Sequence, residues 1–374
     1  MIHERRAPPT SPLFLLRQTL DGNRRALSRL ISLAEDDPEK LDEALAVAHL
    51  KAGRALSIGI TGFPGSGKST LVDKLIAAFR AAGKTVAVLA VDPSSPFSGG
   101  AVLGDRIRMQ HAAGDPGVFI RSLGSRGHLG GVSRSTRDVM KILDAFGFDL
   151  IVVETVGTGQ SEIEVVRLVD SCVVVLVPGL GDDIQALKAG ILEIADLFVV
   201  NKRDHQGAER TKMEIESMLD MSRPGACPSQ QAAWDAHHGA MPVTVAAPAA
   251  APLAPAAAGP AAWRPPVVLT QANANLGIDD LVGEVARHQE ALRLTRELTA
   301  RRRRRCRDEL LEQMTWALRR RAEQALAAPE AESVVQCLEQ RVCSPGRAAR
   351  SILAREWAMS NVITEGGSHV RPIV

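Results

Sequence analysis

Residues Ala55–Ala82, ALSIGITGFPGSGKSTLVDKLIAAFRAA, carry the strongest signal in the chain. Their centre, Gly62–Ser69, fits the pattern G-x-x-x-x-G-K-[ST] of a phosphate-binding loop. The apolar segment Ala55–Thr61 predicts a buried strand before the loop, and Thr70–Ala82 predicts an amphipathic helix after it. Backbone N–H groups and the dipole of such a helix point at bound phosphates. We expect the lysine of this loop to reach the β- and γ-phosphates and the serine after it to hold magnesium.

Length and composition exclude several classes of protein. At 374 residues the chain can hold one large domain with appendages, or two domains. Hydrophobic residues make up 45% and charged residues 24%, which is typical of a globular protein, and the net charge of +2 gives no argument for nucleic-acid binding. Apolar runs such as Ser171–Pro178 are too short to cross a bilayer, and Met1–Thr10 lacks the apolar core of a secretory signal. We therefore expect a cytoplasmic protein that binds neither nucleic acid nor membrane.

The five cysteines are odd in number and form no C-x-x-C pair, which argues against a disulfide framework and against structural zinc. Cys172 lies inside a predicted strand, and we interpret it as a small core residue.

The middle of the chain alternates strands with helices. The predicted strands are Ala55–Thr61, Thr85–Asp92, Val118–Arg121, Asp149–Glu154, Ser171–Val177, Leu197–Asn201 and Val267–Thr270. Helices are predicted at Arg134–Phe146, Asp183–Ala195 and Asp279–Glu297. Near-continuous apolar strands between helices indicate an α/β fold of the P-loop NTPase type, with a mostly parallel sheet covered on both faces. Before it, Phe14–Leu50 shows leucines at helical spacing, and Pro38 is expected to break this run into two helices.

Two stretches depart from that alternation. Met221–Ala262 is rich in Ala, Pro and Gly and cannot bury enough apolar surface to offset its ordering entropy, so we expect a flexible insertion. From Leu292 onward the sequence is helical and rich in arginine. The run Arg301–Arg305 is a candidate for gripping nucleic acid, but the near-neutral chain favours a solvated helix face or an oligomer arm. The expected domains are an N-terminal helical extension at 1–54, a nucleotide-binding domain at 55–291 and a C-terminal helical region at 292–374.

Acidic residues end two of the predicted strands. Glu154 ends one of them, at the position from which an acid in P-loop proteins approaches magnesium directly or through water. Gly157 follows in the same block, where a glycine leaves its N–H free to meet the γ-phosphate and permits a switch motion. Asp92 ends another strand, and Asp105 opens a helix after the intervening Pro-, Ser- and Gly-rich loop. Because ligands bind at the carboxyl edge of such a sheet, both are candidates for the magnesium shell, although an ordinary strand-to-helix loop explains their spacing equally well.

A second motif concerns the base of a nucleotide. Asn201-Lys202-Arg203-Asp204 follows a later strand and fits N-K-x-D, the guanine-recognition motif. Asp204 can accept hydrogen bonds from guanine N1–H and from the N2 amino group, which adenine lacks, so the wrong base leaves buried polar groups unpaired. Thr270-Gln271-Ala272-Asn273, after the last predicted strand, lies where a base-contacting loop belongs. Together with the phosphate loop, these residues predict binding of a guanine nucleotide.

With these motifs in place, the chain resembles the MeaB/ArgK family of P-loop GTPases, whose eukaryotic members serve methylmalonyl-CoA mutase. The resemblance rests on GITGFPGSGKSTL, VAVLAVDPSSPFSGGAVLGDRIRM, SRGHLGGVSRSTRDVM, DLIVVETVGTGQSEIEV and NKRD. WRPPVVLTQANANLGIDDL and SPGRAARSIL extend it toward the C-terminus, and DGNRRALSRLISLAED matches the family's N-terminal helical opening. The resemblance covers nearly the whole chain outside the Ala/Pro-rich insertion and the segment from about Trp357. Its ETVGxGQSE block is much more specific than a phosphate loop alone.

The resemblance implies a GTPase that uses Mg²⁺, binds GTP and GDP, and guards and loads an adenosylcobalamin-dependent acyl-CoA mutase. Its catalytic residues are then Lys68, Asp105 and Glu154. By motif position the phosphates fall to Gly62, Phe63, Pro64, Gly65, Ser66, Gly67, Lys68, Ser69 and Thr70, and the magnesium shell to Ser69, Asp92, Asp105 and Glu154. The first switch holds Asp105, the second holds Gly157–Glu162, and the base is read by Asn201, Lys202 and Asp204, with Gln271, Ala272 and Asn273 in the base loop. Members form homodimers through C-terminal helices, which fits Leu292–Glu339.

This chain departs from the family pattern at the base loop. Gln271 stands where the family usually has serine, although the backbone donor of Ala272 survives. The Ala/Pro-rich insertion lies between NKRD and that loop and could displace the loop.

Other functions remain open from the residues alone. A nickel or cobalt metallochaperone GTPase carries His-rich tracts or Cys/His pairs, whereas the one adjacent histidine pair here, His237-His238, lies in the insertion. A P-loop small-molecule kinase is disfavoured by the guanine motif and the two switch-like loops. A non-enzymatic scaffold is disfavoured by the joint presence of Lys68, Ser69 and Glu154. Among clients, methylmalonyl-CoA mutase is the leading candidate, and isobutyryl-CoA mutase is another.

Overall fold

The computed structural model describes residues 11–92, 114–124, 131–155, 167–179, 194–221 and 263–352. Asp105, Gly157–Glu162, most of the predicted helix Asp183–Ala195 and residues 222–262 of the predicted insertion lie outside these ranges. The chain divides into two compact units, residues 1–305 and 306–374. The first unit includes the N-terminal helices and the start of the arginine-rich region, and the expected domain boundaries at residues 54 and 291 stay predictions.

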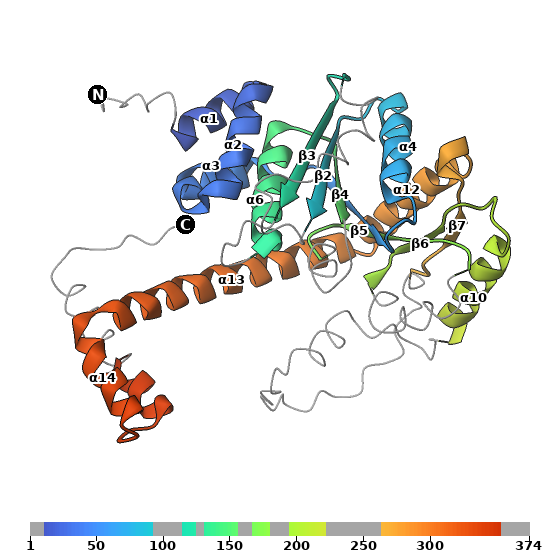
Figure 1. Ribbon diagram of the computed structural model, residues 1–374. Coiled ribbons are helices and arrows are strands. Elements are labelled where there is room, and N and C mark those ends of the chain that lie inside the picture. Colours follow the sequence, from blue (N-terminus) through green and yellow to red (C-terminus); the bar gives the residue numbers. More distant parts are fainter. Residues whose placement is uncertain are drawn as a thin grey trace, which may run out of the picture. The chain divides into compact units, whose positions relative to one another are not determined.

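The first unit is built on one seven-stranded sheet, in which all neighbouring described strands are parallel (Figure 1). The strand order is β3-β2-β4-β1-β5-β6-β7. The strands are β1 Leu56–Gly62, β2 Val86–Asp92, β3 Val118–Gly124, β4 Leu150–Thr155, β5 Ser171–Leu176, β6 Leu197–Val200 and β7 Val267–Leu269. Each coincides with a predicted strand, and only β3 runs clearly past its predicted end. The prediction of a parallel α/β sheet is confirmed.

Both faces of this sheet are covered by helices, as successive side chains along a strand point to opposite faces. In β4, Leu150 and Val152 pack into one core with α4 (Lys68–Ala81) and α12 (Ile278–Leu294). Ile151 and Val153, which alternate with them along β4, pack into a second core with α6 (Gly131–Phe146) and α10 (Ala208–Met221). Because both sets are buried, the strand is apolar at every one of these positions, which is the pattern expected of a parallel sheet.

The N-terminal helices pack outside α6, as Figure 1 shows. They are α1 Pro12–Leu20, α2 Arg24–Asp36, the short 3-10 helix η1 Pro38–Leu41 and α3 Asp42–Lys51. The break near Pro38 is confirmed, but the expectation of two helices is wrong because a further break separates α1 from α2. Gly22 adopts φ +86°, and the Asn23 side chain accepts hydrogen bonds from the N–H groups of Arg25 and Ala26, which caps α2. Leu27, Leu30 and Ile31 of α2 are fully buried in the core on this face.

The C-terminal part of the described chain holds α13 (Glu297–Ala327) and α14 (Pro329–Glu339). In the second unit several large apolar side chains are exposed: Leu310, Leu311, Met314, Leu318, Leu326 and Val342. Within the ranges that the structure describes, every helix is too short or too polar to cross a membrane.

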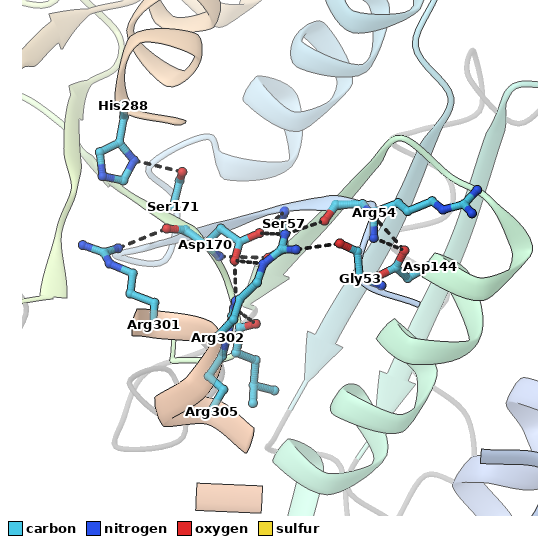
Figure 2. Close-up of polar contacts among 12 residues, drawn as sticks. Gly53, Arg54, Ser57, Asp144, Asp170, Ser171, His288, Arg301, Arg302 and Arg305 are labelled. Atoms are coloured by element: carbon cyan, nitrogen blue, oxygen red, sulfur yellow. Dashed lines mark hydrogen bonds and ion pairs between the residues drawn. The ribbon is translucent and has the colours of Figure 1, made fainter. Parts of the chain in front are cut away.

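The arginine run lies at the amino edge of the sheet, where α13 begins (Figure 2). Arg301 donates two hydrogen bonds of 2.9 Å to Asp196, the residue before β6. Arg302 and Arg305 pair with Asp170, the residue before β5. The side chains of these arginines are only 17%, 30% and 21% exposed. The expectation of a solvated helix face or oligomer arm is therefore wrong for these three residues, and the structure gives them an internal role in the first unit.

Candidate nucleotide site

The predicted phosphate-binding loop connects β1 to α4 and needs glycine at two positions. Gly62 and Gly67 have φ values of +139° and +87°. A Cβ atom on Gly62 would lie 2.1 Å from the Val175 carbonyl oxygen, and one on Gly67 would lie 2.4 Å from the side-chain nitrogen of Asn201. Conformation and space both require glycine there. Since α4 begins at Lys68, the first N–H groups of that helix have no helical acceptor and can bind an anion.

Lys68 lies over the loop that precedes it. Its side chain is almost buried, and its ammonium donates to the carbonyl oxygens of Gly62 at 2.7 Å and Phe63 at 3.0 Å. Two carbonyl oxygens of the loop therefore hold the positively charged ammonium in place. A phosphate in the loop would offer the ammonium a stronger, charge-assisted hydrogen bond than these neutral oxygens do.

Ser69 and Glu154 meet beside the loop. The Ser69 hydroxyl donates to a Glu154 carboxylate oxygen at 2.6 Å, and Glu154 is 1% exposed. A hydroxyl and a carboxylate side by side are the hard oxygen ligands that Mg²⁺ prefers, so this pair fits the predicted magnesium shell. Asp92 ends β2, the strand next to β4, which places its backbone at the same edge. The Asp92 side chain and all of Asp105 lie outside what the structure describes.

Two threonines that sequence reasoning missed join β4 to β1 next to this pair. The Thr155 hydroxyl donates to the Thr61 hydroxyl at 3.0 Å, and both residues are 1% exposed. Thr155 directly follows Glu154, and Thr61 directly precedes the phosphate loop. This contact therefore fixes the acid relative to the loop. Threonine is common in strands, so neither position carried a separate signal in the sequence.

Asn201 links the phosphate loop to the base loop. Its side-chain nitrogen donates to the Ser66 carbonyl at 2.9 Å. Its side-chain oxygen accepts from the Thr270 hydroxyl and from the Ala272 N–H, each at 3.1 Å. Asn201 is 3% exposed, and Thr270 has no exposed surface. The first residue of the guanine motif thus serves as an internal brace between the two loops.

The other residues of the guanine motif form a turn at the end of β6. Lys202 adopts φ +59°, and the Arg203 N–H donates to the Thr270 carbonyl at 3.0 Å, which fastens the turn to the base loop. The Asp204 side chain is 44% exposed and lies 4.0 Å from His205 Nε2. Its carboxylate is therefore accessible to a ligand, as the base-reading role requires.

The base loop closes on itself. Gln271 and Leu276 exchange backbone hydrogen bonds of 3.0 and 3.2 Å, and the short 3-10 helix η2 (Ala272–Ala274) lies between them. The backbone donor of Ala272, which was expected to serve the base, donates to Asn201 instead. Asn273 is exposed. The structure thus brings Ala272 into the site, whereas the roles of Gln271 and Asn273 stay predictions.

Known proteins resemble this chain in sequence and in fold. A sequence profile described as methylmalonyl-CoA mutase-associated GTPase MeaB matches residues 27–327. A putative GTPase of Pyrococcus abyssi is 42% identical over 339 residues, which is 91% of this chain and 95% of the relative. The mitochondrial methylmalonic aciduria type A homolog of Caenorhabditis briggsae is 38% identical over 229 residues, 56% of this chain and 55% of the relative. A solved LAO/AO transport system kinase has a TM-score of 0.62 at 24% identity, covering 94% and 99% of the two chains, and shows the shared fold.

The phosphate loop, the Ser69–Glu154 pair and the guanine motif lie together at one edge of the sheet, within the span that the family profile matches. The chain is therefore a P-loop GTPase and belongs to the methylmalonyl-CoA mutase-associated GTPase family MeaB.

Proposed function

We propose that this GTPase gates the loading of adenosylcobalamin into a cobalamin-dependent acyl-CoA mutase and protects that mutase, with methylmalonyl-CoA mutase as the client. The observation that carries the proposal is the assembled guanine-nucleotide site in a chain whose family is described as mutase-associated. The relative named for methylmalonic aciduria supports the same client.

In this proposal the nucleotide phosphates bind at the start of α4. The backbone of Gly62–Thr70 surrounds them, and Lys68 exchanges its loop carbonyls for phosphate oxygens. Ser69 and Glu154 would hold Mg²⁺, with Asp92 and Asp105 completing the shell and Gly157 meeting the γ-phosphate. When bound, Mg²⁺ neutralises charge on the β- and γ-phosphates. The Thr155–Thr61 contact would keep Glu154 at a fixed position while GTP is hydrolysed to GDP.

The base would be read by Asp204, whose exposed carboxylate accepts the two guanine donors. Asn201 holds the base loop and the phosphate loop together, so a nucleotide that contacts both meets a single braced surface. Lys202 is expected to pack along the base, and Gln271–Asn273 to border it.

The proposal includes a homodimer formed through the C-terminal helices, in a cytoplasmic protein. Its support is the exposed stripe of Leu310, Leu311, Met314 and Leu318, which recur at helical spacing along α13. A second copy of the chain would cover this stripe.

Turnover measurements with a partner test the proposal. Slow GTP hydrolysis by the isolated protein should accelerate with a purified methylmalonyl-CoA mutase, because partners that order the switches or supply charge raise such rates by ~10³–10⁵ in the best-known cases. Transfer of adenosylcobalamin to the mutase should differ between GTP, GDP and a non-hydrolysable analogue. Isobutyryl-CoA mutase serves as the alternative client. No stimulation and no nucleotide dependence with either mutase would leave only a GTPase with a different client.

A further inference from the structure

Asp170 is the centre of a buried charge cluster at the amino edge of the sheet, opposite to the nucleotide site (Figure 2). It is 1% exposed, and its carboxylate pairs with Arg302 at 3.0 Å and with Arg305. It also accepts from the Ser57 N–H at 3.2 Å, while its own N–H donates to the Ser57 hydroxyl oxygen at 2.8 Å. Burial alone would raise the pKa of Asp170, but the charges and hydrogen bonds of the two arginines hold that pKa below its ordinary value. The carboxylate therefore stays charged and keeps both arginines in place.

The same helix also holds the backbone that leads into β5. Arg305 Nη1 donates to the Leu168 carbonyl at 2.6 Å, and Arg301 Nη1 donates to the Asp170 carbonyl at 3.0 Å. In sequence, this segment ends the stretch that leaves the nucleotide edge after Thr155. The arginines therefore bind the backbone at Leu168 and Asp170, which follow the predicted second switch in the sequence.

Arg302 reaches a second backbone segment, the linker between α3 and β1. Its two terminal nitrogens donate to the carbonyl oxygens of Gly53 at 2.7 Å and Ala55 at 3.0 Å. The N–H groups of this linker donate to the Asp144 carboxylate of α6 on its other side, as Figure 2 shows. One guanidinium thus contacts the chain just before β1, the strand that ends in the phosphate loop.

A serine, a histidine and an aspartate line up beside this cluster, but they form no hydrolytic site. Ser171 Oγ lies 2.9 Å from His288 Nδ1, and His288 Nε2 lies 3.3 Å from Asp196. Ser171 and His288 have no exposed surface, and the Trp263 ring packs 4.8 Å from the His288 ring. A substrate cannot reach a hydroxyl in this position. These residues instead fix Asp196, which in turn receives Arg301.

We propose that one cluster of residues couples the nucleotide site to α13. We call this cluster the arginine joint, and it consists of Asp170, Arg301, Arg302 and Arg305. The inference rests on the proposed nucleotide cycle and adds the route by which that cycle reaches α13. A shift of β1, which ends in the phosphate loop, would move the Gly53 and Ala55 carbonyls that Arg302 holds and with them the start of α13. Since coupling between two equilibria is reciprocal, anything that moves the root of α13 also changes nucleotide affinity. The arginine joint is then the contact through which each end influences the other.

A label on Cys306 can report on the arginine joint, because this exposed cysteine directly follows Arg305. The protein for this experiment is the full chain with Cys227, Cys337 and Cys343 replaced by serine and a spin label on Cys306. Cys172 is kept because it is buried. Electron paramagnetic resonance spectra are recorded with GDP and with a non-hydrolysable GTP analogue. We expect the spectrum to differ between the two nucleotides.

The matched variants are Arg305→Gln, inside the arginine joint, and Arg303→Gln, an exposed arginine on the same helix with the same change in charge. Arg303→Gln should keep the nucleotide-dependent difference, and Arg305→Gln should abolish it. If Arg305→Gln does not fold, Ser57→Ala removes one contact of Asp170 and should reduce the difference. Identical spectra with the two nucleotides in the parent, or an undiminished difference in Arg305→Gln or Ser57→Ala, would overturn the inference.

Nucleotide affinity is measured in parallel with a fluorescent GDP analogue. Intact binding with no response at Cys306 refutes the arginine joint and leaves the proposed function standing. Failure to bind guanine nucleotide at all refutes both.

Discussion

The two edges of the sheet handle charge in opposite ways. At the carboxyl edge, the glycine-rich loop, the first N–H groups of α4 and the Lys68 ammonium offer positive charge and hydrogen-bond donors to a phosphate. At the amino edge, Asp170 and Asp196 receive arginines from α13 and form closed ion pairs. The densest charge in the sequence, the arginine run, thus lies where no ligand is needed. Charge density is therefore a poor guide to the ligand site, and the order of strand, glycine loop and helix is a good one.

The largest expected effect comes from opening the amino edge. Asp170→Asn leaves Arg302 and Arg305 without their charged partner, and breaking a buried pair in this way costs about 3–5 kcal/mol, with the lower figure fitting these partly exposed arginines. Urea unfolding should show this loss. Glu214→Gln removes one partner of the exposed Arg210–Glu214 pair and should cost less than about 0.5 kcal/mol. Equal losses in the two variants would show that the amino edge is not a buried ionic cluster.

The next effect belongs to the carboxyl edge. Lys68→Ala should abolish productive GTP binding and hydrolysis while the fold remains, because it removes a charge-assisted phosphate contact of about 1.5–3 kcal/mol or more. GTP turnover is the measurement, with the exposed Lys51→Ala as the control. Hydrolysis at the parent rate would show that Lys68 does not hold the phosphates. Loss of turnover without loss of stability in Lys68→Ala, beside loss of stability in Asp170→Asn, would separate the roles of the two edges.

Acid should lower the free energy of unfolding through the charged residues of the amino edge. Burial acts to raise the pKa of Asp196, but the hydrogen bond with His288 and the charge of Arg301 lower it to about 2. A lowered folded-state pKa gives stability that is full above the unfolded value of about 3.9 and is lost as the pH falls toward about 2. At 1.36 kcal/mol for each pKa unit, Asp196 contributes roughly 2–3 kcal/mol. In Asp196→Asn the slope of unfolding free energy against pH should flatten in this window, and an unchanged slope would assign the acid sensitivity to other groups.

The smallest effect is a change of preference at the base. Asp204→Asn should weaken GTP binding and improve binding of xanthosine triphosphate, because xanthine has a carbonyl where guanine has its amino group and an amide can donate to it. The expected change is roughly 1–2 kcal/mol, about the value of one or two hydrogen bonds. Competition between the two nucleotides measures it. Unfolding should be unaffected, since the Asp204 side chain is 44% exposed. A preference for GTP that stays the same would remove Asp204 from the base site.

The strands and the phosphate loop follow from local sequence, and the internal use of the arginines does not. All seven strands were predictable because each is a short apolar run bounded by turn residues. Ser69 and Glu154 were predictable because motif spacing fixes where a strand end meets the loop. Arg301 pairs with Asp196, and Arg302 and Arg305 pair with Asp170. Such pairings across the chain depend on tertiary packing, which periodicity and composition do not contain.

The break between α1 and α2 is the opposite case. Here the local sequence did contain a helix-boundary signal, but the regular leucine spacing outweighed it in the prediction. Asp21-Gly22-Asn23 holds a left-handed glycine and a side-chain cap, both of which mark a helix boundary. The regular leucine spacing on either side concealed it, because both helices bury leucines on the same core.

The close approach of Gly67 to Asn201 limits how this protein can be re-engineered. Its recognition of the base is not a detachable module, because Asn201 also supports the loop that holds the phosphates. A graft of NKRD into another P-loop scaffold would also need Gly67, which makes room for Asn201, and Thr270, whose hydroxyl orients the Asn201 side chain. Redesign toward a different nucleobase is therefore best confined to Asp204, whose side chain is 44% exposed, and should leave the buried Asn201 unchanged.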